Sequence, residues 1–186
     1  MGKPRPTNDT ALFHTFAAAA KQLADLHIGY EQAKEYSLTR RENPKAQLHW
    51  RVEKMKLIKV GTSSTASHSP SDPKAGVPTE PAPTASIVYN DFLTLEGIPP
   101  ETFDYRLGNR SVLDWVIDQY QVSTDKRSGI TNDPNRPDDP QYIVRLIAQV
   151  ITVSLETVQI IKALPPLSPL QPSNHPEATS CVVIGH

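Results

Sequence analysis

Apolar side chains over residues 8–28 recur at steps of three and four residues, which predicts one face of an amphipathic helix. That face carries Leu12, Phe13, Phe16, Ala20, Leu23 and His27. Thr7 or Asn8 could cap the start of this helix, and Gly29 could end it. The stripe is strong enough that we expect the helix to pack on another element.

Two further helices are predicted in the second half of the chain, over residues 111–121 and 140–164. Ser111 stands at the N-cap position of the first, and Asp114 places an acid in the first turn, which the helix dipole favours. Asp139 could cap the second, with Pro140 at its first position. Its apolar stripe is broad, so this last helix is expected to be buried on more than one side.

Alternating polarity predicts a short antiparallel sheet. Residues 50–60 alternate imperfectly and predict one strand, and residues 86–96 predict two more. Asn90 and Asp91 separate the latter two and favour a hairpin turn. Together these elements predict a small α+β domain with three main helices.

Proline divides the chain. Ten of its 18 prolines lie in residues 61–85 and 165–186, where large apolar side chains are scarce. Such segments bury too little surface to offset the entropy of ordering the chain, so we expect a disordered insertion and a disordered tail. The remaining parts are an N-terminal helix with a basic strand (1–60) and a core (86–164).

Charge and cysteine content narrow the protein class. The net charge is −1 and the only cysteine is Cys181, which argues against a polybasic protein and against a disulfide scaffold. Neither a signal peptide nor an apolar run of membrane-spanning length is expected. The sequence therefore predicts a soluble, cytoplasmic protein without a membrane partner.

Motifs for catalysis are missing from the sequence. It contains neither a phosphate-binding loop, a dinucleotide glycine fingerprint nor a His-Glu-x-x-His zinc motif. Asp114 and Asp118 lie four residues apart and could act as paired acids, but a solvated helix face explains them more simply. We predict no catalytic residue, no metal site and no cofactor.

Basic residues cluster locally despite the balanced total. From Arg40 to Lys59 the chain holds seven Lys and Arg against two acids. Lys and Arg can contact phosphates, and Arg and Asn can also bind base edges. An ordinary solvated surface is the alternative explanation for these residues.

Several blocks resemble the C-terminal specificity domain of type ISP restriction–modification enzymes. The blocks are Leu23–Glu31, Arg51–Lys56, Ile87–Asp91, Leu95–Pro99, Tyr105–Val122, Thr124–Asn135 and Val153–Thr157. Their order and spacing make the resemblance specific, and it covers roughly residues 10–60 and 86–165. The insertion at 61–85 is longer than the family leads us to expect.

In that family one large polypeptide joins a nuclease, an ATP-driven DNA translocase, an adenine methyltransferase and the recognition domain. The resemblance implies that this chain reads a site on double-stranded DNA for a methyltransferase–translocase portion housed elsewhere. The methyltransferase and helicase motifs are absent from this chain, so it is expected to perform no chemistry itself. The predicted DNA-contacting residues are Arg51, Lys54, Lys56, Asn109, Arg110, Lys126 and Arg127.

Two other classes stay open at this point. The chain could be a non-catalytic helical module that docks onto other proteins, or a truncated remnant of such an enzyme.

Overall fold

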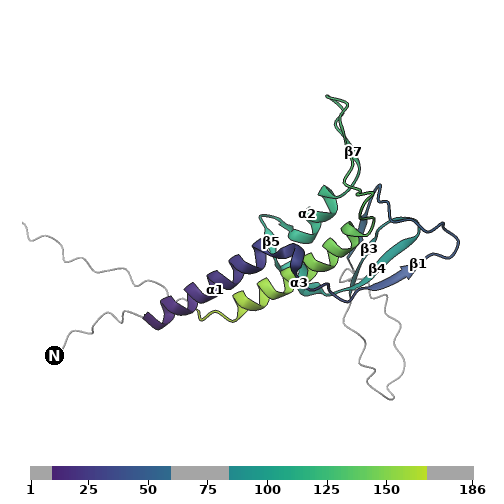
Figure 1. The fold of residues 1–186 in the computed structure, drawn as a ribbon. Coiled ribbons are helices and arrows are strands. Elements are labelled where there is room, and N and C mark those ends of the chain that lie inside the picture. Colours follow the sequence, from purple (N-terminus) through teal and green to yellow (C-terminus); the bar gives the residue numbers. More distant parts are fainter. Residues whose placement is uncertain (1–9, 60–83, 167–186) are drawn as a thin grey trace, which may run out of the picture.

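The computed structural model describes residues 10–59 and 84–166, which contain three α-helices and a four-stranded antiparallel sheet (Figure 1). This is the α+β class that the sequence predicts. The helices are α1 (Thr10–Ile28), α2 (Val112–Gln119) and α3 (Tyr142–Lys162). The sheet has the order β1-β4-β3-β2, with bounds Thr39–Glu42, Leu93–Ile98, Ala85–Val88 and Lys56–Ile58 respectively.

Shorter elements connect these parts. Two 3-10 helices, η1 and η2, span Tyr30–Gln32 and Pro100–Asp104. Two small hairpins flank α2: β5 and β6 (Arg106–Leu107 and Arg110–Ser111) precede it, and β7 and β8 (Ser123–Thr124 and Thr131–Asn132) follow it.

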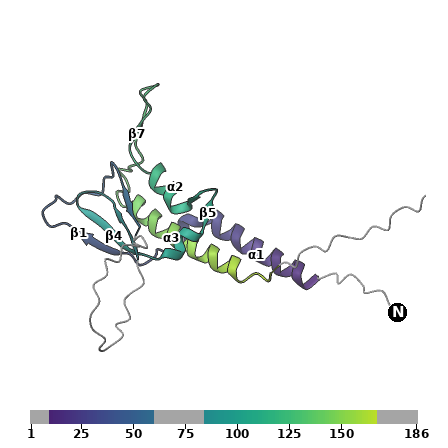
Figure 2. The ribbon, with the colours of Figure 1, turned by 180° about the vertical axis from the view of Figure 1, so that it is seen from behind.

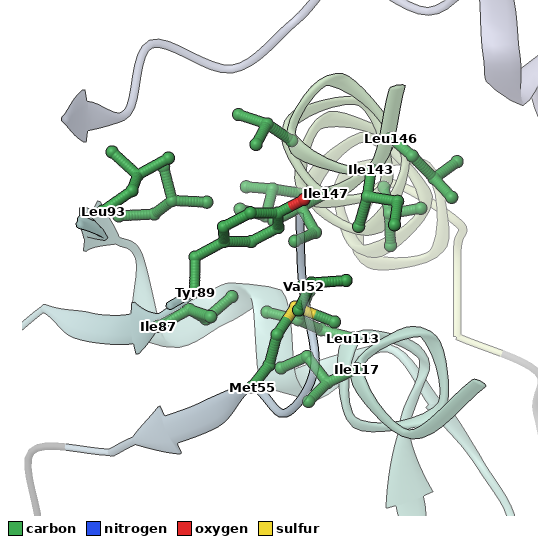
Figure 3. Packing of buried hydrophobic residues seen from close by; sticks show 14 of the residues in the cluster. Val52, Met55, Ile87, Tyr89, Leu93, Leu113, Ile117, Ile143, Leu146 and Ile147 are labelled. Atoms are coloured by element: carbon green, nitrogen blue, oxygen red, sulfur yellow. The ribbon is translucent and has the colours of Figure 1, made fainter. Parts of the chain in front are cut away.

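Helix α3 is the centre of the core. Twelve of its residues are buried, on more than one side of the helix, as its broad apolar stripe predicts. Figure 3 shows Ile143 and Ile147 facing Tyr89 of the β3–β4 hairpin and Leu113 of α2. By length and composition α3 could span a membrane, but most of it is buried within the protein, as core helices of soluble proteins are.

A bulge keeps the strand β4 on the core. Leu93 and Leu95 point inward, and strict alternation would place residue 97 there next. Gly97 instead adopts φ +88°, and the pairing with β3 shifts register at this point, so that Ile98 is the next buried residue. Glycine tolerates this backbone conformation, which strains side chains with a Cβ.

The structure corrects the strand predicted over residues 50–60. Among residues 50–59, only Lys56–Ile58 forms a strand. Val52 and Met55 are both buried although they lie three residues apart, which alternation forbids in a regular strand. Residues 50–55 therefore cross the core edge as an irregular segment, held by the contacts described below.

Strand β1 was not predicted, because all four of its residues are polar and exposed. It is an edge strand held by backbone pairing to β4, and Arg41 Nη1 lies 3.3 Å from Glu96 Oε1 across that pair. Backbone pairing needs no apolar side chain, so periodicity cannot reveal it.

Helix ends agree in part with their predicted caps. Ser111 and Asp114 form a reciprocal capping box at α2, and α1 ends at Ile28 before Gly29. The prediction for α3 was wrong: its N-cap is Gln141, and the Asp139 carboxylate instead binds the guanidinium of Arg145. The proposed caps Thr7 and Asn8 lie outside the described residues.

The predicted insertion and tail also lie almost wholly outside the described residues. Ala85, which was assigned to the insertion, is instead buried at the start of β3. Residues on the two sides of this insertion, Met55 and Ile87 among them, share one hydrophobic core.

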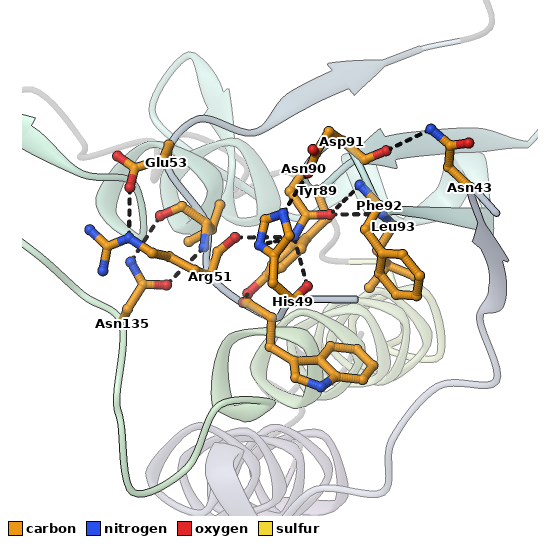
Figure 4. A network of polar contacts seen from close by, with 12 residues as sticks. Asn43, His49, Arg51, Glu53, Tyr89, Asn90, Asp91, Phe92, Leu93 and Asn135 are labelled. Carbon is orange, nitrogen blue, oxygen red and sulfur yellow. Dashed lines mark hydrogen bonds and ion pairs between the residues drawn. The ribbon is translucent and has the colours of Figure 1, made fainter. Parts of the chain in front are cut away.

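Asn90 connects the β3–β4 turn to the irregular segment (Figure 4). Its Oδ1 accepts hydrogen bonds from the backbone N–H groups of Phe92 and Leu93, and its Nδ2 donates to the carbonyl oxygens of His49 and Arg51. Beside it, the Tyr89 hydroxyl donates to the Trp50 carbonyl at 2.8 Å. The apolar surroundings of Tyr89 raise the pKa of its hydroxyl, so this group stays a donor.

We predict that Asn90→Ala lowers the free energy of unfolding by about 2 kcal/mol, because it leaves several part-buried backbone groups without partners. Denaturant unfolding measures this loss. Asn132→Ala, at an exposed position in β8, is the control and should change stability by less than about 0.5 kcal/mol. Equal stability of the two variants would contradict the role given to Asn90.

Asp114 gives a second prediction, on pH. Burial raises the pKa of this carboxyl, but hydrogen bonds from Ser111 and Lys59 outweigh burial, so the net pKa lies below its ordinary value. A carboxyl with a depressed pKa in the folded state stabilises the protein above its unfolded-state pKa, near 4, and loses that contribution as pH falls through the folded-state value.

The stability of the wild type should therefore fall more steeply than that of Asp114→Asn as the pH falls below about 4.5. Urea unfolding at a series of pH values measures both slopes. Asp138→Asn removes the same charge from an exposed loop and serves as the control. If both variants keep the wild-type slope, the capping carboxylate does not titrate as described.

Candidate nucleic-acid interface

The β7–β8 hairpin projects from the body of the protein (Figures 1 and 2). Ser123 pairs with Asn132 and Thr124 with Thr131, and the two threonine hydroxyls lie 2.9 Å apart. Every residue from 123 to 132 is exposed. We call residues 123–132 the finger.

Backbone hydrogen bonds fix the tip of the finger. The Asp125 carboxylate accepts from the N–H groups of Arg127 and Ser128, at 2.6 and 3.1 Å. These bonds lower the pKa of Asp125, which keeps it ionised. The Asp125 N–H donates to the Ile130 carbonyl, and the Asp125 carbonyl accepts from the Gly129 N–H; Gly129 has φ +71°.

Two cationic side chains and one apolar side chain at this tip are exposed to solvent. The side chains of Lys126 and Arg127 form no hydrogen bond or ion pair with another described residue. Ile130 is 70% exposed. The finger therefore carries net positive charge, because its two cations outnumber its single acid, Asp125. The carboxylate of Asp125 is turned to its own backbone.

The base of the finger is held by the irregular segment 51–54. On the outgoing side, the Val122 N–H donates to the Glu53 carbonyl at 3.1 Å, and Lys54 Nζ donates to the Val122 carbonyl at 2.9 Å. On the returning side, the Asn135 amide accepts from the Val52 N–H and donates to the Val52 carbonyl, both at 2.8 Å (Figure 4). The segment 51–54 therefore binds the chain both before and after the hairpin.

Ion pairs add to these hydrogen bonds at the base of the finger. Arg51 Nη2 lies 2.8 Å from Asp133 Oδ2, and Arg51 Nε donates to Glu53 Oε1 at 2.7 Å. Hydrogen bonds from Asn135 and then from Arg51 lower the pKa of Asp133. We call Arg51, Val52, Lys54, Asp133 and Asn135 the clasp.

A hollow of about 290 Å³ adjoins the clasp, and its lining includes His49, Trp50 and Arg51. His49 Nε2 lies 2.5 Å from Asp91 Oδ1, and this contact lowers the pKa of Asp91. Arg136 also lines the hollow and stacks on the Tyr142 ring, with its guanidinium carbon 3.4 Å from the ring centroid.

Four of the seven predicted DNA-contacting residues lie on the finger or at its base. Arg51 and Lys54 lie at the base of the finger, and Lys126 and Arg127 lie at its tip. Arg51 and Lys54 are engaged within the clasp, whereas the tip residues are open to solvent. All seven assignments stay predictions.

The other three predicted residues lie outside the finger and its base. Asn109 is in the β5–β6 turn and Arg110 in β6, before the opposite end of α2. Arg110 Nη2 binds Asp118 Oδ2 at 2.6 Å and the Asp114 carbonyl at 3.1 Å, and its guanidinium stacks on Trp115. Lys56 is exposed on β2 and forms no ion pair with a described residue.

Sequence reasoning missed the clasp and Ile130. Asn135 and Val52 are 83 residues apart, and neither has a local pattern that marks the pair. Ile130 could have been found as an apolar residue in an otherwise polar, basic loop. Within residues 10–59 and 84–166 no group of three His, Cys, Asp or Glu side chains could hold a metal ion.

Comparisons with known proteins identify the family. The family model described as the type ISP C-terminal specificity domain matches residues 6–146. A search among curated proteins finds no similar sequence.

Solved structures similar to this chain include the ATP-dependent type ISP restriction–modification enzyme LlaBIII bound to DNA, with 36% identity and a TM-score of 0.62. A nuclease-deletion mutant of the type ISP enzyme LlaGI with a DNA substrate mimic has 36% identity and a TM-score of 0.60. A DrdV–DNA complex has 28% identity and a TM-score of 0.59.

The similarities cover 83%, 82% and 82% of this chain, but only 9%, 12% and 14% of those chains. The chain thus spans a small part of the proteins it resembles. The matched family model and the 36% identity to a type ISP enzyme agree with each other and with the blocks found in the sequence. This chain belongs to the type ISP C-terminal specificity domain family.

Proposed function

We propose that this domain recognises a DNA target on behalf of a larger type ISP restriction–modification enzyme. The observation that carries the proposal is the family match, together with similar solved structures that contain DNA. The geometry of this chain also supports the proposal, because the projecting finger carries two unpaired cations at its tip.

The free cations favour the finger over the other predicted contacts. Arg51 and Arg110 already hold carboxylates at 2.8 and 2.6 Å, so binding a phosphate would disturb an existing ion pair. Lys126 and Arg127 need no such exchange. Lys54, Lys56 and Asn109 are further candidate contacts along the same proposal.

The catalytic steps of the enzyme would belong to its other modules. This chain lacks the methyltransferase and helicase motifs, so we infer that it acts by binding alone and without a cofactor. A soluble cytoplasmic location fits a domain that acts on DNA within such an enzyme.

Helix α1 favours a second, compatible role in docking. Among its residues only Ala19 is buried, although the sequence predicted a packed stripe, and Phe13 and Ile28 are 69% and 82% exposed. The helix contacts α3 along one side (Figure 2). We infer that the rest of the enzyme covers part of its remaining face, because exposed aromatic and aliphatic side chains mark docking surfaces.

Salt dependence of duplex binding tests the main proposal. Each phosphate contacted should add about −0.9 to the slope of log affinity against log salt, so four contacts give about −3.6. Replacing both Lys126 and Arg127 by Ala should reduce the slope by about 1.8 if each contacts one phosphate. Fluorescence anisotropy of the full chain with a randomised duplex pool measures the slopes.

A matched variant controls for net charge. Lys21→Ala with Lys162→Ala removes two cations from α1 and α3, away from the finger. This control should keep the wild-type slope. A wild-type slope near zero, or an equal loss in both double variants, would count against the proposal.

A further inference from the structure

We propose that the finger is a two-stranded ribbon that enters the major groove of the target duplex, where Arg127 and Ile130 read base edges. This inference rests on the proposed DNA recognition and adds the element, the groove and the reading side chains.

The dimensions of the finger fit the major groove. Paired strands lie about 4.8 Å apart. The paired part of the finger is two residues long on each side, and residues 125–130 close it as a turn. The major groove is about 12 Å wide and about 8.5 Å deep and admits a two-stranded ribbon. The minor groove, at about 6 Å, is too narrow for paired strands that carry side chains on both faces.

The two side chains that we assign to base reading suit the edges of different bases. The Arg127 guanidinium can donate two parallel hydrogen bonds to O6 and N7 of guanine, and the Ile130 side chain can pack on the methyl group of thymine. Lys126, a compact charge on a flexible stem, suits a flanking phosphate better. Asp125 is the only acid from residue 123 to 132, and its engaged carboxylate does not compete.

The finger is organised before any partner binds. Its tip is fixed by the Asp125 bonds and its base by the clasp, so binding would order little additional chain. Its exposed side chains contribute nothing to the hydrophobic core, so packing does not account for this hairpin. A hydrogen-bonded, basic and unburied ribbon fits a role in recognition.

The test begins with the preferred duplex of the wild-type chain, selected from a randomised pool. The measured quantity is the affinity ratio between that duplex and a scrambled one. Arg127→Lys keeps the charge but loses the planar fork, and should lower the ratio by about 10- to 100-fold, the range of one bidentate pair. The salt slope should stay within about 0.5 of the wild-type value, because the charge is retained.

Modified DNA identifies the groove. Replacing guanine by 7-deazaguanine removes the N7 acceptor from the major groove only. This replacement should weaken wild-type binding, and it should have a much smaller effect on Arg127→Lys. Ile130→Ser should lower discrimination at a thymine position, and uracil in place of that thymine should weaken wild-type binding in the same way.

Lys21→Arg is the control for a conservative cation change, and thermal unfolding should give the same Tm for all finger variants. If the wild type discriminates between duplexes and the finger variants keep its ratio, the inference is wrong while the proposed function stands. Sensitivity to the variants without sensitivity to 7-deazaguanine would overturn the major-groove assignment. Absence of any duplex preference in the wild type would overturn both.

Discussion

Burial of α3 is the constraint on which the rest of the structure depends. Its residues touch the sheet, the irregular segment and α2, so elements far apart in sequence share one apolar core. Removing apolar surface from water stabilises this arrangement by about 25 cal/mol per Å². The positions of the sheet and α2 then fix where the chain can leave the core, and the finger begins where α2 ends.

The polar contacts have a different role from the hydrophobic core. The clasp and the Asn90 network lie at the core edge, where backbone groups of residues 49–54 would otherwise lack partners. An irregular segment needs such side-chain partners, because it cannot pair its own backbone as a strand does. Satisfying this need also fixes the base of the finger, so the same hydrogen bonds support stability and placement.

Ion pairs determine which cations of this nearly neutral chain remain unpaired at its surface. Arg41, Arg51, Lys59 and Arg110 each lie next to a carboxylate in the folded protein. Such exposed pairs contribute little stability individually, but they reduce the positive potential of the surface around them. Lys126 and Arg127 lack such partners among the described residues, so a protein with a net charge of −1 can still present a local basic tip.

Local patterns in the sequence determined much of the fold. The N-cap at Ser111, the broad stripe of α3 and the β3–β4 hairpin depend on residues two to four positions apart, and each was predicted correctly. Strand β1, the irregular segment and the clasp depend on partners dozens of residues away, so only the tertiary structure decided them. The same holds for the candidate site: the sequence named its cations, but their distant neighbours decide which stay unpaired. Sequence proximity fixes local geometry, whereas the choice of partner for a charge or a free backbone group depends on how the whole chain packs.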